Sequence, residues 1–402
     1  MSTFLEFLVK LASHLGIKIS VEELKKNVKD EAEMVAHVLD EINKYFYQQH
    51  KNLDKKYISE FHRYWEKEHE HILNPQIDKE ACIKVAQVLE IIYRNNIIKV
   101  QKETLDLKPE EIANVRFFTA IQDFNIDINA KGNPFEFYKS HPECFDAKRI
   151  VENESLITNL LSYLDATTQG DKRKKWAKES AKLLVMEYNG SAYNLLEKHD
   201  SDPVKIREKL GASVGYGFSK KKVDMFLRDM VDLGVWEYKN NFDQIDVMSD
   251  VNTMRIALRT GILKFRIPLL ASYLDVYCFQ YELVDKYTSM AWRKVWDEWG
   301  KLPNNHRPPT PASIDYFIYQ MGKTVCNKTA RKCYPMKKVD KKWLIRHKIM
   351  DRLMINDGYC IFNNICQLER KILHPPKSIS QKQRTGWDTG ITDEGGGLGI
   401  SS

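Results

Sequence analysis

The sequence has no apolar run long enough to cross a membrane. None of its uninterrupted hydrophobic stretches approaches the roughly 18 residues of a transmembrane helix, and the chain combines 43% hydrophobic with 29% charged residues. This balance excludes a collagen-like chain and a wholly disordered one as well as a membrane protein. We therefore expect a folded protein that works in water and has no membrane partner.

A secretory leader is also missing. The first residues, MSTFLEFLVKLASHLG, contain neither the basic segment nor the small-residue cleavage site of an export signal. We expect a cytoplasmic, nucleoid-associated protein. Seven cysteines occur among 402 residues, and in a reducing compartment they are thiols or metal ligands rather than disulfides.

Strand alternation, β-hairpin turns, internal repeats and heptad arrays are absent from the sequence. Apolar residues recur instead at helical intervals, as in 79–100, 177–188 and 219–233. This periodicity predicts an all-α fold.

Turn residues and composition suggest where the chain divides. Leu107 and Lys108 precede Pro109 in a segment typical of a turn. Beyond Pro375 the sequence turns to Gly, Ser, Thr and Lys, a composition typical of a mobile tail. We expect three parts, namely an N-terminal helical region over 1–107, a second helical domain over 108–375 and a flexible tail over 376–402.

Positive charge is concentrated in the C-terminal two thirds of the chain. The whole protein has 62 basic and 55 acidic residues, a formal charge of +7. The segments 171–182, 217–228 and 331–348 are mostly basic and contain interleaved aromatic residues. Such segments favour a polyanionic partner, although a solvated charged face is the ordinary alternative.

A glycine-rich turn is the most informative local feature. Gly211, Gly215 and Gly217 crowd a short segment directly before a helix that we expect to start near Ser219. Backbone N–H groups at such a position face outward, with the positive end of the helix dipole behind them. The turn is therefore a candidate phosphate site.

An aspartate begins another amphipathic helix about 30 residues later. Asp250 precedes VNTMRIALRTG and is the expected N-cap of a helix that ends at Gly261. An aspartate at this position is most often only a cap.

The two segments together resemble the helix-hairpin-helix DNA glycosylase superfamily. There a hairpin of the type L-P-G-x-G-x-x-[KT] is followed by a loop and a helix beginning V-D-[TV]-[HN]-x-x-R. Here GYGFSKKKVD stands for the first motif and SDVNTMRIALRTGIL for the second. The hairpin lacks the usual proline and has Tyr216 between its glycines. The F-S-K start and the long gap before the aspartate are most similar to the archaeal 8-oxoguanine glycosylases.

The resemblance implies roles for individual residues. Asp250 corresponds to the carboxylate that stabilises positive charge on the deoxyribose while the N-glycosidic bond breaks. In members that also cut the strand, an unprotonated lysine attacks the sugar. The ordinary bifunctional pattern selects Lys221 for this role, and the archaeal pattern selects Lys220. The implied contacts to the DNA strand come from Gly215, Gly217, Ser219, Lys222 and Arg255.

Three residues are candidates for a pocket that holds an extruded base. Trp176 and Trp236 flank the hairpin and are able to stack on a base, and Gln122 is able to bond to a base edge. Each has a structural alternative, because tryptophan is usually core and a buried amide often satisfies backbone groups.

Four cysteines near the C-terminus form two pairs. Cys326 and Cys333 are separated by six residues, Cys360 and Cys366 by five, and the pairs by 26. The iron–sulfur members of the superfamily have spacings of six, two and five. The resemblance thus implies a structural iron–sulfur cluster held by the four thiolates. Zinc is an alternative metal for four thiolates. A third interpretation is that these are ordinary buried cysteines.

The sequence as a whole predicts a DNA glycosylase that binds double-stranded DNA, flips a base and hydrolyses its glycosidic bond, with AP lyase activity as an added function. Its substrate class includes damaged bases and hypermodified bases of phage DNA, the latter giving a role in antiviral defence. Catalysis is expected to require no cofactor, and no obligate protein partner is inferred. The alternatives are a non-enzymatic DNA-binding protein and a zinc-stabilised regulator.

Overall fold

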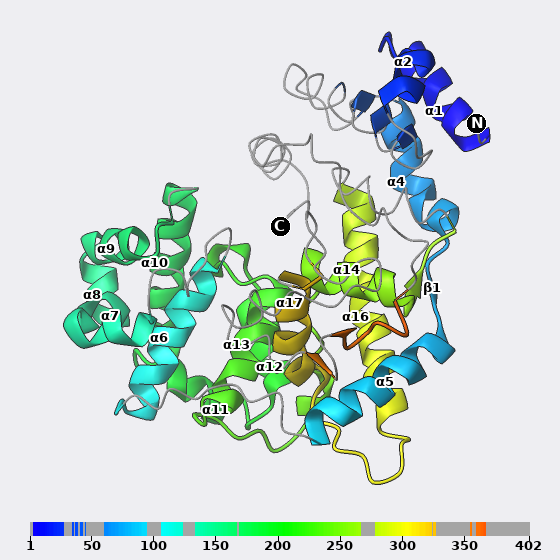
Figure 1. The fold of residues 1–402 in the computed structure, drawn as a ribbon. Coiled ribbons are helices and arrows are strands. Elements are labelled where there is room, and N and C mark those ends of the chain that lie inside the picture. Colours follow the sequence, from blue (N-terminus) through cyan, green and yellow to red (C-terminus); the bar gives the residue numbers. More distant parts are fainter. Residues whose placement is uncertain are drawn as a thin grey trace. The chain divides into compact units, whose positions relative to one another are not determined.

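The protein is represented by a computed structural model, which describes residues 3–27, 34, 35, 37, 38, 41, 42, 45, 60–94, 106–123, 133–166, 169–266, 278–323, 325, 326, 354, 355 and 359–366. Most of these residues lie in helices, and each described strand has only two residues (Figure 1). The all-α prediction is therefore confirmed. The expected flexible tail over 376–402 lies outside the described residues.

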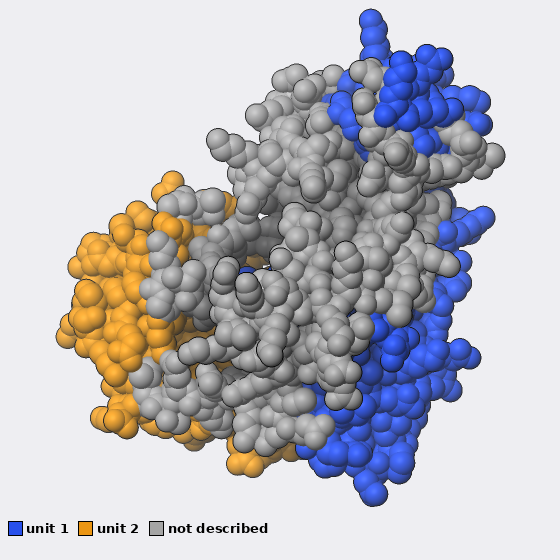
Figure 2. Space-filling model, viewed as in Figure 1, with its two compact units in different colours: residues 1–97, 249–306, 317–401 blue, residues 98–248, 307–316, 402 orange. Residues whose placement is uncertain are grey.

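The chain divides into two compact units (Figure 2). Unit 1 contains residues 1–97, 249–306 and 317–401, and unit 2 contains 98–248, 307–316 and 402. Unit 2 is thus inserted into unit 1 along the chain. This grouping differs from the expected ranges of 1–107 and 108–375, because residues 249–306 belong with the N-terminal part of the chain.

Unit 1 is built from helices and two small antiparallel ladders. Its elements are α1 (Thr3–His14), α2 (Val21–Asn27), α4 (Glu60–Leu73), β1 (Gln76–Ile77), α5 (Lys79–Arg94), α14 (Val251–Thr260), β2 (Leu263–Lys264), α16 (Cys278–Trp299), β3 (Met354–Ile355) and β4 (Tyr359–Cys360). Most of α17 (Asp315–Lys323) also belongs to it. β1 pairs with β2, and β3 pairs with β4.

The packing of α5 on α16 forms the centre of unit 1. The buried face of α5 includes Cys82, Val85 and Leu89, which recur at helical spacing. Trp292 of α16 is fully buried and donates from Nε1 to the Thr253 carbonyl at 3.4 Å. This contact joins α16 to α14, the helix that begins after Asp250.

Unit 2 is entirely helical in its described residues. Its α-helices are α6 (Pro109–Gln122), α7 (Pro134–Ser140), α8 (Ala147–Glu152), α9 (Ser155–Tyr163), α10 (Gly170–Glu187), α11 (Leu195–Lys198), α12 (Pro203–Gly211) and α13 (Lys220–Asp232). Short 3₁₀ turns connect them, namely η2 (Pro142–Phe145), η3 (Ala192–Asn194), η4 (Val214–Tyr216), η5 (Phe242–Gln244) and η6 (Pro311–Ile314).

Helix α6 lies at the centre of unit 2 and packs against both α10 and α13 (Figure 1). An aromatic cluster fills the space beside α13. Phe117 contacts Phe218 and Phe226 with ring centroids 5.1 and 5.6 Å apart. These buried rings hold the turn between α12 and α13 against the core.

The helix ends expected at Ser219, Asp250 and Gly261 are confirmed. Asp202 and Ser219 are the N-caps of α12 and α13, and Asp250 is the N-cap of α14. Gly234 and Gly261 adopt positive φ angles of 73° and 78° just after α13 and α14. Glycine is favoured at this left-handed position after a helix because it has no Cβ.

Candidate nucleic-acid interface and catalytic residues

The glycine turn joins α12 to α13 in unit 2. Ser213 accepts a hydrogen bond from the Gly215 amide at 3.1 Å, which fixes the start of η4. Gly217 follows in the left-handed region with φ of 72°. Ser219 then caps α13 by accepting from the Lys222 amide at 3.4 Å. Two serine caps and one left-handed glycine therefore define the path of the turn.

Gly217 is required by close packing as well as by its φ angle. A Cβ at this position would lie 2.7 Å from Cβ and Cγ of Trp176 and 2.9 Å from Cγ2 of Ile121. Contacts this short do not occur for real Cβ atoms. Trp176 therefore supports the turn directly from α10, which fits the structural alternative for this residue.

The amides of the turn are mostly used within it. Besides the Gly215 amide, that of Tyr216 donates to the Ser213 carbonyl, and that of Gly217 to the Val214 carbonyl. This corrects the expectation that the glycine amides themselves face outward. Among the described residues, no acceptor is found for the backbone amides of residues 218–221. The candidate anion-binding position is thus the first turn of α13.

The three adjacent lysines have different surroundings. Lys220 is exposed, and its Nζ lies 3.6 Å from Oδ2 of Asp246. Lys221 is half-buried. Lys222 is buried, and its Nζ donates to the carbonyl oxygens of Ile121 at 2.7 Å and Gly217 at 3.1 Å. Only Lys220 and Lys221 are therefore placed to reach a polyanion in solution.

Burial changes the protonation of Lys222. It lowers the pKa of this amine to about 7, while the carboxylate of Asp123 acts in the opposite direction and Arg173 adds to the lowering. Nζ also lies 4.6 Å from the centroid of the Trp176 ring. The amine thus sits among the end of α6, the turn and α10.

A buried polar cluster surrounds the end of α6. Arg173 is fully buried and donates from Nη1 to the Gln122 carbonyl at 2.5 Å, while Nε2 of Gln122 donates to the Arg173 carbonyl at 3.4 Å. Oε1 of Gln122 is buried and has no hydrogen-bond partner among the described residues. Burial raises the pKa of Asp123 beside them. The Gln122 side chain is thus fully buried and its amide nitrogen bonds to backbone, which fits the structural alternative for this residue.

Trp236 lies in the core of unit 2. Its side chain is buried and packs edge-on against Phe226, with ring centroids 5.3 Å apart. Its Nε1 has no hydrogen-bond partner within the described part of the chain. These contacts fit the structural alternative for Trp236.

Asp250 lies in unit 1, whereas the glycine turn and the lysines lie in unit 2. Its Oδ1 accepts from the amides of Asn252 and Thr253, both at 2.8 Å. Its Oδ2 accepts from Nδ2 of Asn252 at 3.1 Å, and the hydroxyl of Thr253 completes a capping box. The carboxylate is thus held rigidly by its own helix, and only 8% of the residue is exposed.

Arg255 contacts its own unit. It is buried, and Nη1 donates to the Gly322 carbonyl at 2.8 Å and to Oδ1 of Asn252 at 3.1 Å. Burial lowers the pKa of this guanidinium to about 10. Arg259, one turn further, donates to the carbonyl and to Sγ of Cys326, both at 2.7 Å. The bond from Arg255 to Gly322 attaches α14 to the end of α17, and its DNA contact stays a prediction.

The four cysteines are only partly described. Cys326 and Cys360 are buried, Cys366 is half-buried, and none of the three forms a disulfide within the described residues. Cys333 lies outside the described residues. Among the residues that are described, no group of three or more His, Cys, Asp or Glu side chains is arranged to hold a metal ion. A four-cysteine cluster or zinc site remains a prediction.

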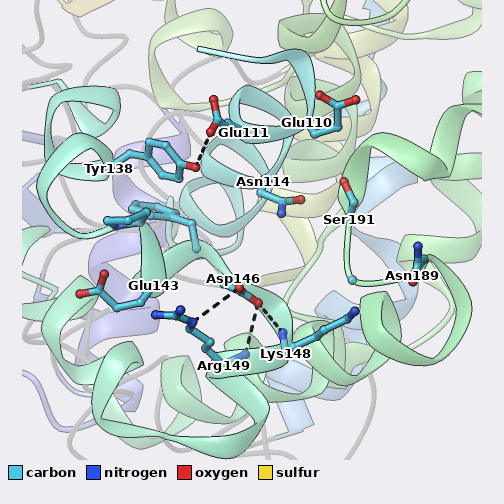
Figure 3. Close-up of a pocket in the computed structure, with 13 residues that line it drawn as sticks. Glu110, Glu111, Asn114, Tyr138, Glu143, Asp146, Lys148, Arg149, Asn189 and Ser191 are labelled. Carbon is cyan, nitrogen blue, oxygen red and sulfur yellow. Dashed lines mark hydrogen bonds and ion pairs between the residues drawn. The ribbon is translucent and has the colours of Figure 1, made fainter.

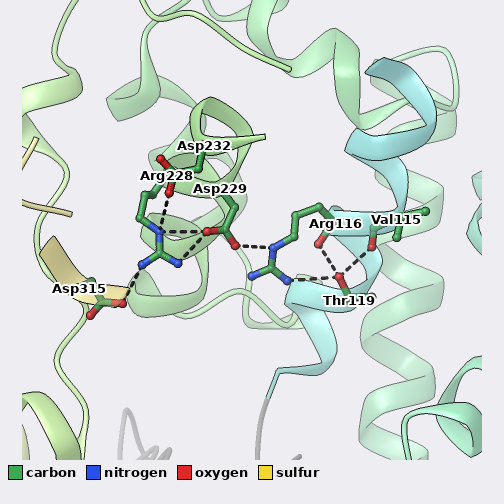
Figure 4. Close-up of polar contacts among 7 residues, drawn as sticks. All are labelled: Val115, Arg116, Thr119, Arg228, Asp229, Asp232 and Asp315. Carbon is green, nitrogen blue, oxygen red and sulfur yellow. Dashed lines mark hydrogen bonds and ion pairs between the residues drawn. The ribbon is translucent and has the colours of Figure 1, made fainter. Parts of the chain in front are cut away.

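An ionic network in unit 2 connects α6, α13 and the start of α17 (Figure 4). Arg228 donates to Asp229 and Asp315, each at 2.7 Å, and lies 3.7 Å from Asp232. Arg116 donates from Nε to Asp229 at 2.5 Å. Burial alone would lower the pKa of Arg228, but the three carboxylates raise it. Each of these five charged groups has a partner within the network, so its clearest role is to hold helices together.

A separate pocket of about 420 Å³ opens at the beginning of α6 (Figure 3). Glu111 accepts from the Tyr138 hydroxyl at 3.1 Å. Asp146 caps α8 by accepting from the Lys148 amide at 2.9 Å, and it lies 3.9 Å from Arg149. Much of the lining charge is thus already paired within unit 2, and the pocket lies at the opposite end of α6 from Lys222.

The sequence did not identify Arg173 or the burial of Lys222. One signal was available for Lys222, because it shares a helical face with Phe226 and Met230, both fully buried. A lysine that lies four and eight residues before buried apolar residues in a helix shares their face, so it is expected to be partly buried. Arg173, within the basic run of 171–182, offers the same signal, because Ala177 and Ala181, four and eight positions later, are both fully buried.

Comparison with models of known protein families finds none that matches the chain. Comparison with curated protein sequences likewise finds no match. In the described residues, no helix has both the length and the apolar character needed to span a bilayer.

Proposed function

We propose that the protein is a DNA glycosylase that binds duplex DNA, extrudes a damaged or modified base and hydrolyses its N-glycosidic bond. The observation that supports this best is the turn before α13. The turn packs on Trp176 at the left-handed Gly217, and the amides of 218–221 have no acceptor among the described residues. Lys220 is exposed at the same place. This combination suits a phosphate of a nucleic acid strand.

Asp250 is the proposed catalytic carboxylate. Breaking the N-glycosidic bond builds positive charge on the deoxyribose, and a fixed carboxylate stabilises that charge. The capping box supplies the rigidity that such a group needs, because both carboxylate oxygens have defined partners. The assignment itself depends on the resemblance of SDVNTMRIALRTGIL to the glycosylase motif.

Strand cleavage, if the enzyme performs it, is assigned to Lys220 or Lys221. These side chains are exposed and half-buried, whereas the amine of Lys222 bonds to two carbonyls. Attack by a lysine requires the neutral amine and gives a Schiff base with the sugar. We include hypermodified bases of phage DNA in the substrate class, which would make the protein an antiviral defence enzyme.

The decisive experiment incubates the protein with duplexes that carry oxidised, alkylated, deaminated or hypermodified bases and identifies released bases by mass spectrometry. Asp250→Asn is the informative variant, because asparagine caps a helix about as well as aspartate. We expect one base to be released by the wild type and none by the variant, with duplex affinity unchanged. Borohydride trapping in Lys220→Met and Lys221→Met identifies the lyase residue.

A non-enzymatic DNA-binding protein is the second candidate. It is favoured by one observation, that the hydrogen bonds of the Asp250 carboxylate given by the structure all come from the first turn of its own helix. In that case the duplexes bind, no base is released from any of them, and Asp250→Asn changes nothing that the assay measures.

A further inference from the structure

Lys222 belongs to the basic run of the hairpin, and a lysine there is expected to contact a DNA phosphate. Its position is inconsistent with that role. Only 6% of the residue is exposed, and its amine donates to the carbonyls of Ile121 and Gly217. The amine therefore points away from solvent and joins the last turn of α6 to the left-handed residue of the glycine turn.

Three contacts meet at this point. The Ile121 carbonyl belongs to the end of α6, where orphan carbonyls and the negative end of the helix dipole favour a cation. The Gly217 carbonyl belongs to the residue on which the turn depends. Trp176 lies against both the amine and Gly217. A bond from Lys222 thus fixes the orientation of the peptide that leads into the amides of 218–221, for which the described part of the chain supplies no acceptor.

The charged groups that act on Lys222 are few. Asp123 at the end of α6 favours the charged amine, while Lys172 and Arg173 of α10 and Lys221 of α13 oppose it. Within the described part of the chain, no carboxylate lies within ion-pair distance of Lys222. The bonds to the two carbonyls are therefore its main polar interactions.

We propose that Lys222 is a positioning residue for the DNA interface, one that orders the glycine turn for phosphate binding without itself contacting a phosphate. The part of this proposal that concerns DNA binding rests on the proposed function. Its structural part, the ordering of the turn, is measurable without DNA.

The salt dependence of duplex binding separates the two roles. Each lysine that contacts a phosphate contributes about one unit to the slope of log affinity against log salt concentration. We expect Lys222→Met to lower duplex affinity about tenfold and to leave this slope unchanged. The matched variant Lys220→Met, two positions earlier and exposed, is expected to reduce the slope by about one unit.

Hydrogen exchange of the peptide that covers residues 213–219 measures the turn directly. We expect Lys222→Met to increase exchange in the free protein about tenfold, whereas Lys220→Met leaves it as in the wild type. Lys222→Arg retains a cation at the carbonyls and is expected to recover most of the protection. Because arginine is also charged, this variant shows whether lost order follows from loss of the cation or from a general failure to fold.

The outcomes are distinct. A reduced salt slope in Lys222→Met would mean that Lys222 contacts phosphate. Unchanged hydrogen exchange of residues 213–219 in Lys222→Met would mean that Lys222 does not order the turn. Either result overturns the proposal. If exchange changes as expected but the wild type binds no duplex, the ordering role stands and the DNA function fails.

Discussion

Replacing Gly217 by alanine is expected to destabilise unit 2 strongly. The new Cβ would meet Trp176 at 2.7 Å and Ile121 at 2.9 Å, in a backbone with φ of 72°. A left-handed conformation costs a non-glycine residue about 1–2 kcal/mol, and overpacking of a filled site adds about 1–3 kcal/mol. We therefore expect the free energy of unfolding to fall by about 3 kcal/mol.

Urea denaturation followed by circular dichroism measures this change. Gly211→Ala is the matched control, because Gly211 lies in α12 and a Cβ there meets nothing within 4 Å. Alanine at that position is expected to stabilise the helix by about 0.5–1 kcal/mol, since glycine is the poorer helix former.

A double substitution tests the reason for the effect. Trp176→Ala removes the nearest obstacle, so that Gly217→Ala should cost less in that background than in the wild type. A loss below about 0.5 kcal/mol for Gly217→Ala alone, or equal losses in both backgrounds, would refute the close packing of Trp176 on the turn.

Two further predictions concern buried charges. Burial alone would raise the pKa of Glu90, but bonds from the His306 amide and side chain, Trp299 and Arg94 lower it to about 2. This depressed pKa contributes stability above about pH 4.5 that is lost as the pH falls towards 2. Glu90→Gln should therefore lower the free energy of unfolding at pH 7 by about 3 kcal/mol and flatten its pH dependence between pH 4.5 and 2. Acid titration of both proteins by circular dichroism checks this, and parallel curves would contradict it. Arg228→Met leaves three carboxylates without their central cation, so the free energy of unfolding measured by urea denaturation should fall by about 3–5 kcal/mol. A loss no larger than that caused by substituting an exposed lysine would show that the network is not buried as described.

Local structure was predictable from the sequence because its causes are local. Ser219 and Asp250 cap helices through atoms two or three residues away, and Gly261 ends one through its own conformation. The helical periodicity likewise needs no knowledge of distant segments.

Surroundings made by distant segments were not predictable. Lys222 is buried because the end of α6, 101 positions earlier, supplies its acceptor. Arg255 reads as a DNA contact in the sequence, yet its acceptor is the Gly322 carbonyl, 67 positions later. For Lys222 the one local signal is its helical spacing to the buried Phe226 and Met230.

The insertion of unit 2 into unit 1 affects the order in which the protein folds during synthesis. Helix α5 finds its packing partner in α16, and the contact between Cys82 and Ala291 spans 209 positions. Nearly all of unit 2 leaves the ribosome before α16 does, and N-terminal segments generally fold first where they are able to. The apolar face of α5 thus stays uncovered through the synthesis of a whole compact unit, which makes this stage of translation the one most exposed to aggregation and to capture by chaperones.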